Sequence, residues 1–333
     1  MPSRALAVRA ERVVNPYAFV VGCPRSGTTL LQRLVDAHPD IAMLDEALWI
    51  PSHSERRKVL TPDGRVTPAL VARLLERRQF DRMGIGRDEL HALVGPDGGM
   101  RYADLVTALC DRYGKARGKP LVADKIPRYV RRIRTLHELW PAARFVHLIR
   151  DGRDVALSFM GWPKADAIAR SWPTWQEDKV TTTALWWERS VRLGREQGAA
   201  LGGERYREMR YEALVASPAR ECEALCAFLE IPYTSAMLRF YEGKTKRDRG
   251  LSPKKAWLPP TPGLRDWRTQ MAPEALERFE AAAGGLLDEL GYERAVVRPS
   301  RAAREGVTAV RKSYLEVLRA GGKRLPAEWA ERE

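Results

Sequence analysis

The sharpest candidate for chemistry is a turn between a predicted strand and a predicted helix. The segment Gly22–Thr29 reads GCPRSGTT and overlaps the end of an apolar run, Tyr17–Cys23. Backbone N–H groups of such a turn face one point, and the positive end of the helix dipole adds to the potential there. The turn is therefore expected to bind an anion, and Arg25 supplies a cationic side chain two residues before Gly27.

This turn differs from the loop that holds nucleoside triphosphates. The Walker pattern G-x-x-x-x-G-K-[ST] requires a Lys after its second Gly, and Thr28 occupies that position here. Without the Lys, and with no evident Mg²⁺ partner, phosphoryl transfer from a triphosphate is disfavoured. A P-loop small-molecule kinase remains the alternative enzyme. A non-catalytic module that binds anions or RNA is the alternative from another functional class.

A second set of anion-binding side chains follows the apolar run Arg144–Ile149. Arg150 comes directly after this run, and Ser158 lies eight residues later on a predicted helix. Ligands of α/β sheets bind beyond the carboxyl ends of the strands. There an Arg can hold a phosphate through two parallel hydrogen bonds, and a Ser hydroxyl can add another. The alternative is a solvated Arg-Asp turn with Ser158 packed against its helix.

Short apolar runs alternate with segments of helical periodicity along the chain. The expected strands are Tyr17–Cys23, Leu121–Ala123, Arg144–Ile149 and Arg205–Arg210, and the clearest expected helices are Thr28–Ala37, Val155–Met160 and Pro218–Leu229. This alternation predicts an α/β fold whose parallel sheet is covered on both faces. Residues 52–118 are expected to be mostly helical, and 303–318 to form an amphipathic helix packed on the protein's own core.

Composition excludes several classes of protein. The 333 residues are 44% apolar, which argues against global disorder, and no apolar run approaches the roughly 20 residues of a membrane span. The formal charge of +14 indicates an anionic partner, but no nucleic-acid motif accompanies it, so no nucleic acid is expected. Four cysteines without a signal-like N-terminus predict a cytoplasmic protein. Cys222 and Cys226 are interpreted as buried helix residues rather than a metal pair.

The motifs together resemble those of sulfotransferases, in particular the bacterial and tyrosylprotein branch. The matching segments are Pro24–Leu30, Asp36–Asp40, Asp45–Glu46, Asp124–Pro127, Arg150–Ser158 and Arg210–Leu214. The resemblance implies a P-loop-type parallel sheet flanked by helices, with helical insertions, over 17–295. Residues 1–16 would be an N-terminal extension and 296–333 a C-terminal helical extension. These enzymes use 3′-phosphoadenosine 5′-phosphosulfate (PAPS) as donor, and no motif requires a metal.

The resemblance also implies roles for individual residues. The donor would be held by Arg25, Ser26, Gly27, Thr28 and Thr29 at the 5′-phosphosulfate, by Arg150 and Ser158 at the 3′-phosphate, and by Tyr211 near the adenine. Lys125 and Arg25 would stabilise charge on the sulfuryl group and the leaving phosphate. For Lys125 the alternative is an ordinary surface position, and for Tyr211 it is structural packing.

The acceptor oxygen needs a base to take its proton. The family's catalytic Glu corresponds to Glu46, with Asp45 as its rival and His53 as the next candidate. Ala47 and Leu48 stand where the tyrosylprotein branch has polar residues, which counts against a peptide tyrosine as acceptor. A small-molecule, carbohydrate or lipid hydroxyl is expected instead, and a homodimer is left open. The basic residues of 242–262 either close over the 3′-phosphate or form a solvated loop.

Overall fold

The computed structural model describes residues 14–44, 50, 59–76, 78–81, 83–95, 99–242 and 258–331. The chain divides into two compact units. The first comprises residues 1–22, 27–148 and 197–261, and the second comprises 23–26, 149–196 and 262–333. Each unit is described separately.

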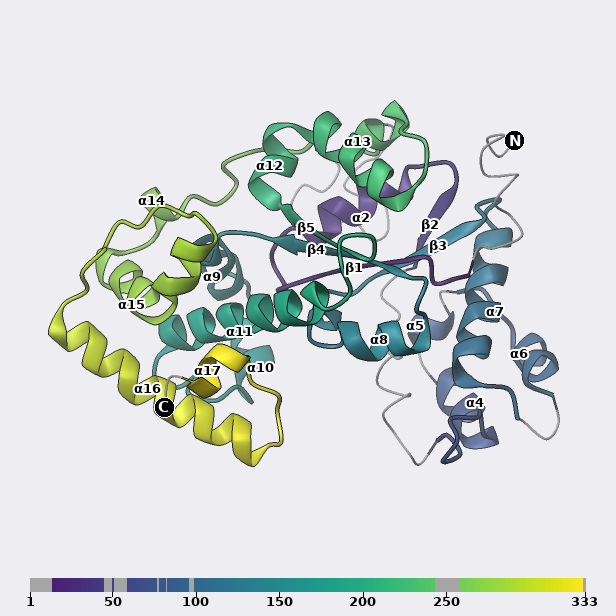
Figure 1. The fold of residues 1–333 in the computed structure, drawn as a ribbon, viewed down its shortest axis with the longest axis horizontal. Coiled ribbons are helices and arrows are strands. Elements are labelled where there is room, and N and C mark those ends of the chain that lie inside the picture. The colour runs from purple at the N-terminus through teal and green to yellow at the C-terminus, as the bar shows by residue number, and fades with distance from the viewer. Residues whose placement is uncertain are drawn as a thin grey trace. The chain divides into compact units, whose positions relative to one another are not determined.

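The first unit contains the sheet. Its five strands are β1 (Ala18–Gly22), β2 (Ile41–Leu44), β3 (Leu121–Lys125), β4 (Arg144–Ile149) and β5 (Tyr206–Arg210), in the spatial order β2-β3-β1-β4-β5 (Figure 1). Strand β1 pairs in parallel with β3 on one side and β4 on the other, and β2 pairs in parallel with β3. The expected α/β architecture with a parallel sheet is confirmed.

Both faces of this sheet are buried, as alternate residues of β1 show. Phe19 and Val21 belong to one apolar cluster, whereas Ala18 and Val20 belong to another. Successive side chains of a strand point to opposite faces, so the two clusters cover the two faces. Buried residues on both faces explain why the strands read as continuous apolar runs rather than as alternating patterns.

Helices of the first unit contribute to one or other of these clusters. They are α2 (Thr28–Asp36), α4 (Pro68–Leu75), α5 (Arg78–Asp81), α6 (Arg87–Val94), α7 (Tyr102–Lys115), α8 (Ile133–Leu139), α12 (Tyr211–Ala216) and α13 (Pro218–Leu229), with 3₁₀ turns η2 (Pro127–Arg131) and η3 (Ser235–Arg239). Leu31 of α2 and Leu225 of α13 lie in the cluster with Val20, while Leu105 of α7 and Leu136 of α8 lie in the cluster with Phe19. In Figure 1, α2, α12 and α13 accordingly lie on the opposite side of the sheet from α8.

Strand order determines where the first unit presents its functional loops. The chain leaves β1 with β3 and β2 on one side and with β4 and β5 on the other. Ligands of such sheets bind outside the carboxyl ends of the strands at this switch point. Strand β1 ends at Gly22, β3 ends at Lys125 and β4 runs into Arg150, so three predicted site segments begin at carboxyl ends of parallel strands.

The second unit is helical. It contains α9 (Gly152–Met160), α10 (Ala165–Ala169), most of α11 (Lys179–Ala199), α14 (Trp267–Gln270), α15 (Pro273–Glu289), α16 (Arg301–Ala320) and α17 (Ala327–Glu331). Helix α16 packs against α15 and buries Val307, Tyr314 and Leu318, which confirms the expected amphipathic helix on the protein's own core. Val317, although apolar, is 53% exposed, because Leu315 occupies the buried face instead.

Helix α9 is fixed by a buried ionic cluster centred on Arg153. Its guanidinium donates to Asp151 Oδ1 at 3.0 Å and Oδ2 at 2.7 Å, and to Glu280 Oε1 at 2.5 Å. Asp151 also caps the helix by accepting from the N–H of Arg153 at 2.9 Å. Glu280 accepts from the N–H groups of Ala295 and Val296 as well. Because the side chains of Arg153 and Glu280 are nearly or fully buried, each charge depends on its partners.

We expect Arg153→Met to lower the free energy of unfolding by about 3–5 kcal/mol, because it leaves two buried carboxylates without their cation. Arg301, which pairs with Glu305 on the exposed face of α16, provides the matched control. Arg301→Met should change the free energy of unfolding by less than about 1 kcal/mol, since exposed pairs contribute little. Chemical denaturation of both variants measures the difference, and equal losses would contradict this account of the cluster.

Candidate active site

The turn after β1 has an unusual backbone at two residues. Arg25 has φ +80° and Gly27 has φ +91°. A left-handed conformation costs a non-glycine residue of order 1–3 kcal/mol, and such strain is concentrated at functional sites. Gly27 avoids this cost, and its missing side chain also leaves room for Tyr211, because a Cβ there would lie 2.3 Å from Tyr211 Cδ2. The turn therefore requires glycine at 27 and retains strain at 25.

The same turn offers polar groups suited to an anion. Helix α2 begins at Thr28, and its N-cap residue Gly27 provides no side-chain cap for the first N–H groups. Ser26 is fully buried, and within the part of the chain that the structure describes its hydroxyl has no hydrogen-bond partner. Leaving a buried hydroxyl unpaired costs about 1–3 kcal/mol. A ligand oxygen would satisfy this hydroxyl, and an anion would suit the uncapped start of α2.

Arg25 and Ser158, which the sequence places in separate motifs, meet in the second unit. The Nε–H of Arg25 donates to Ser158 Oγ at 3.2 Å. The guanidinium carbon of Arg25 also lies 5.2 Å from the centroid of the Trp162 ring. A hydroxyl that accepts from a cation keeps its own O–H available to donate to an anion. Arg25 thus leaves the Ser158 hydroxyl oriented to donate to an anionic ligand.

Two guanidinium groups of the second unit act electrostatically on Arg25. The pKa of Arg25 is lowered, first by burial and then by the charges of Arg265 and Arg150. Arg150 is ion-paired with Asp154, whose Oδ2 accepts from Arg150 Nη2 at 3.1 Å. Like charges held this close make the site attractive to a multiply charged anion. Arg265 was not identified from the sequence, because no motif or periodicity distinguishes it within its Gly- and Pro-rich surroundings.

The backbone at Arg150 is held by Trp187 of α11. The indole Nε1–H donates to the carbonyl oxygen of Arg150 at 3.1 Å. Gly152 permits this close approach, since a Cβ there would lie 2.4 Å from Trp187 Cδ2. Trp187 is thus a supporting residue of the phosphate motif.

The predicted residues of the first unit form a second group. Lys125 ends β3 opposite Val20 of β1 and is only 3% exposed, so the interpretation as a surface lysine is wrong. Tyr211 begins α12 and packs its ring against Gly27. Thr28 is buried at the start of α2 and Thr29 is partly buried. These positions at strand and helix ends suit the donor contacts that the motifs imply.

His38 has a structural role in the first unit. Its Nδ1 accepts from the N–H of Asp40 at 3.1 Å, which places the ring proton on Nε2. Nε2 then donates to the carbonyl oxygen of Pro232 at 2.7 Å. Both ring nitrogens are used in holding the loop between α2 and β2, so His38 is not available as a base.

Other predicted residues lie outside the described ranges. These are Asp45, Glu46, Ala47, Leu48 and His53, and the basic residues Lys244, Lys246, Arg247, Arg249, Lys254 and Lys255. Their assignments stay predictions from the sequence.

The tryptophans and cysteines divide by burial. Trp175, Trp186 and Trp187 are core residues, whereas Trp162 and Trp172 are only partly buried. Trp172 stacks on Phe159 at 4.8 Å and lies 4.6 Å from Trp186, so Trp162 is the better candidate to meet a ligand.

Burial raises the pKa of Cys222 to about 12 and that of Cys226 to about 11, which confirms that these thiols are inert core groups.

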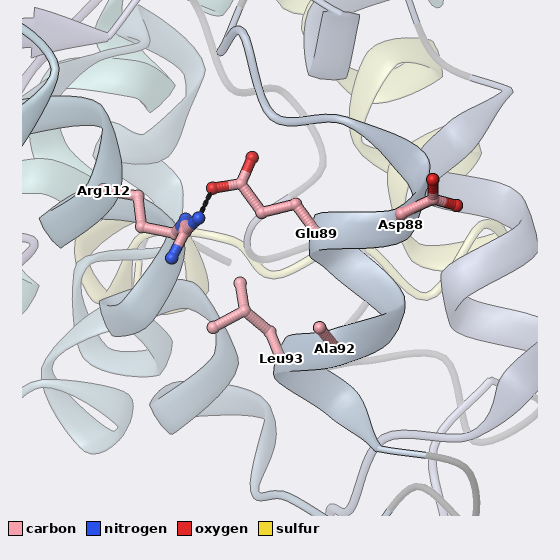
Figure 2. Close-up of a pocket in the computed structure, with 5 residues that line it drawn as sticks. All are labelled: Asp88, Glu89, Ala92, Leu93 and Arg112. Carbon is pink, nitrogen blue, oxygen red and sulfur yellow. Dashed lines mark ion pairs between the residues drawn. The ribbon is translucent and has the colours of Figure 1, made fainter.

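An open depression between α6 and α7 is the surface feature drawn in Figure 2. It is lined by Asp88, Glu89, Ala92, Leu93 and Arg112, and Glu89 pairs with Arg112 across it. None of the predicted site residues lines it, and the charges of Glu89 and Arg112 neutralise each other.

Within the described ranges, no cluster of His, Cys, Asp or Glu suited to a metal ion occurs. Nor does any helix in those ranges have the length and apolar character of a transmembrane span.

Comparison with known proteins identifies several relatives. A nodulation protein, NoeE of Sinorhizobium fredii, is 29% identical over 95% of this chain and 78% of its own length. A protein-tyrosine sulfotransferase of Drosophila melanogaster is 25% identical over 68% of this chain, but this chain spans only 40% of that protein's length.

The fold has counterparts among solved structures. The sulfotransferase domain from the curacin biosynthetic pathway superposes with a TM-score of 0.57 at 20% identity, covering 84% of this chain and 98% of that domain. The model of the Sulfotransferase family matches residues 16–235, which include both anion-binding motifs and the sheet. The chain therefore belongs to the Sulfotransferase family.

Proposed function

We propose that this protein transfers a sulfuryl group from PAPS to the hydroxyl of a small-molecule, carbohydrate or lipid acceptor. The products are a sulfate ester and adenosine 3′,5′-bisphosphate (PAP). The observation that carries the proposal is the meeting of the strained Arg25 with Ser158 of the second anion-binding motif. Family membership supports the same reaction. The cytoplasm is the compartment that we propose.

The residues present fit a donor with two anionic ends. The buried Ser26 hydroxyl and the uncapped first turn of α2 would receive oxygens of the 5′-phosphosulfate. Arg150 and Ser158 would hold the 3′-phosphate, with Arg25 and Arg265 adding positive potential. Tyr211, packed on Gly27, would contact the adenine. A 3′-phosphate is what separates PAPS from ATP, so the second motif would select between them.

The proposed reaction is an in-line transfer. The acceptor oxygen forms a bond to sulfur while the bond from sulfur to the bridging oxygen of the 5′-phosphate breaks. That bridging oxygen leaves as part of PAP with the electron pair. Backbone N–H groups of the turn, Arg25 and Lys125 stabilise the charge that develops on the sulfuryl oxygens and the leaving phosphate. Glu46 takes the acceptor's proton.

The acceptor is proposed from a difference within the family. Ala47 and Leu48 replace the polar residues of the tyrosylprotein branch. A non-peptide hydroxyl is therefore preferred to a peptide tyrosine as the acceptor.

We expect sulfated product from a sugar, phenol or fatty-alcohol acceptor when the protein is incubated with PAPS, and less from a tyrosine peptide. Mass spectrometry of the whole acceptor panel, with PAP release measured in parallel, checks both parts. Release of PAP without any sulfated acceptor would indicate only hydrolysis of the donor. If the tyrosine peptide were the best acceptor, the proposed acceptor class would be wrong.

PAP should raise the melting temperature much more than ATP does, because we propose that Arg150 and Ser158 hold a 3′-phosphate, which ATP lacks. At a concentration 100-fold above its Kd, PAP would stabilise the native state by about 2.7 kcal/mol. Arg150→Met should remove the preference for PAP, whereas Arg301→Met should keep it. Thermal unfolding with each nucleotide measures this, and equal stabilisation by ATP would support the kinase alternative.

Glu46→Gln should lower kcat by about 10²–10⁴-fold while leaving PAP affinity nearly unchanged, because it preserves shape and removes the base. Asp45→Asn is the matched control and should lower kcat much less. Initial rates with a poorly activated alcohol and PAP titrations separate the two effects. The opposite pattern would make Asp45 the base, and near-full activity in both variants would direct attention to His53.

A further inference from the structure

Asp154 of α9 is a buried carboxylate whose two oxygens serve different segments of the second unit. Oδ2 accepts from Arg150 Nη2 at 3.1 Å, and Oδ1 accepts from the backbone N–H of Trp267 at 3.0 Å. Arg150 directly follows β4, whereas Trp267 begins α14, more than 100 residues later. One side chain thus connects the predicted phosphate-binding arginine to a distant part of the sequence.

The segment attached through Trp267 is itself firmly held. The guanidinium carbons of Arg153 and Arg268 lie 3.5 and 4.5 Å from the centroid of the buried Trp267 ring. Asp266 caps α14 by accepting from the N–H of Arg268 at 3.1 Å. Arg153 is in turn fixed by its ionic cluster with Asp151 and Glu280. The anchoring of Trp267 therefore limits where the preceding residues can lie.

Arg265 lies two residues before this anchor and belongs to the group of charges around Arg25. Its charge is among the causes that lower the pKa of Arg25, as is that of Arg150. The carboxylate of Asp154 thus contacts one of these arginines directly and holds the segment that carries another. This connection would let the two cations be aligned on one phosphate.

We propose that Asp154 is a positioning residue for the donor, aligning Arg150 and the segment that bears Arg265 on a phosphate at the 3′ position of the ribose. This inference rests on the proposed function, because it assumes that a PAP-like nucleotide binds these arginines. Asp154 itself would not contact the nucleotide; it would act on it through Arg150 and Trp267.

A role of Asp154 as a counter-charge and a role in positioning the arginines predict opposite effects on nucleotide binding when its carboxylate is neutralised. If Asp154 served only as a counter-charge, its removal would strengthen the positive potential and tighten the binding of every nucleotide anion to a similar degree. If it positions the arginines, its removal weakens the binding of the correct isomer in particular. Two isomers of equal composition and closely similar charge distinguish these cases: PAP, and adenosine 2′,5′-bisphosphate.

The experiment measures the Kd of both isomers by calorimetry for the full chain and for Asp154→Asn. Asn keeps an oxygen acceptor for the Trp267 N–H but loses the ion pair with Arg150. We expect the preference for PAP over the 2′ isomer to fall about tenfold, as for the loss of alignment in one charge-assisted hydrogen bond. Asp288→Asn is the matched control, because Asp288 pairs with Arg294 at the same 3.1 Å but is 57% exposed. Its isomer preference should not change.

A double-mutant cycle tests the second half of the inference. Arg265→Met should weaken PAP binding in the wild-type chain and in Asp154→Asn, where the Trp267 acceptor remains. It should have little further effect in Asp154→Ala, where that acceptor is lost. Melting temperatures without ligand control for folding, and if Asp154→Ala does not fold, Asp154→Asn still tests the isomer preference.

The outcomes separate the inference from the function on which it rests. Failure of the wild-type chain to prefer PAP over its isomer would contradict the proposed 3′-phosphate site. A wild-type preference that survives unchanged in Asp154→Asn, or equal tightening of both isomers, would overturn the positioning role alone. A reduced preference in Asp154→Asn with an unchanged preference in Asp288→Asn would support it.

Discussion

Repulsion among guanidinium groups is the constraint on which the second unit's part of the site depends. The pKa of Arg25 is lowered first by burial and then by the charges of Arg265 and Arg150. Such an arrangement persists only where other interactions compensate for it. The ion pair of Arg150 with Asp154, the hydrogen bond from Arg25 to Ser158 and the contact of Arg25 with Trp162 provide that compensation. The remaining positive potential is what a phosphate would use.

A second set of residues supports these arginines and contacts no ligand in the proposed mechanism. Trp187 holds the carbonyl of Arg150, and Gly152 lets its indole approach the backbone. Arg153 connects the start of α9 to α15 through Glu280, and its guanidinium lies over the ring of Trp267. Positioning residues of this kind make binding selective, because an arginine that is free to move pairs with any anion, whereas a fixed one selects a geometry.

In the first unit, the backbone of the sheet positions the predicted site residues. Parallel pairing of β1 with β3 and β4 brings the ends of these strands to one edge of the sheet. Lys125 is buried at that edge, and Gly27 gives up its side chain so that Tyr211 can pack beside the start of α2.

Local features of the sequence were sufficient to predict the strands and helices whose residues are buried together. The apolar run 144–149 and the periodic segment 218–229 agree with β4 and α13 at both ends. The short strand β2 (Ile41–Leu44) was not recognised, because four apolar residues after a turn do not distinguish a strand from a helix end. Residues 127–139 form η2 followed by α8 rather than one continuous helix, because Arg132, with φ −134° and ψ 15°, departs from helical backbone angles between them.

Motif chemistry indicated the anion-binding turn and the pair Arg150 and Ser158, because the residue types and their short spacing are themselves the signal. The roles of Asp154, Trp187 and Arg265 depend on contacts between segments that lie 37 to more than 100 residues apart. Neither periodicity nor spacing records such contacts, since each residue has ordinary neighbours in the sequence. Only the tertiary structure, by burying Asp154 between Arg150 and the Trp267 backbone, decided which carboxylate pairs with Arg150 and accepts from the start of α14.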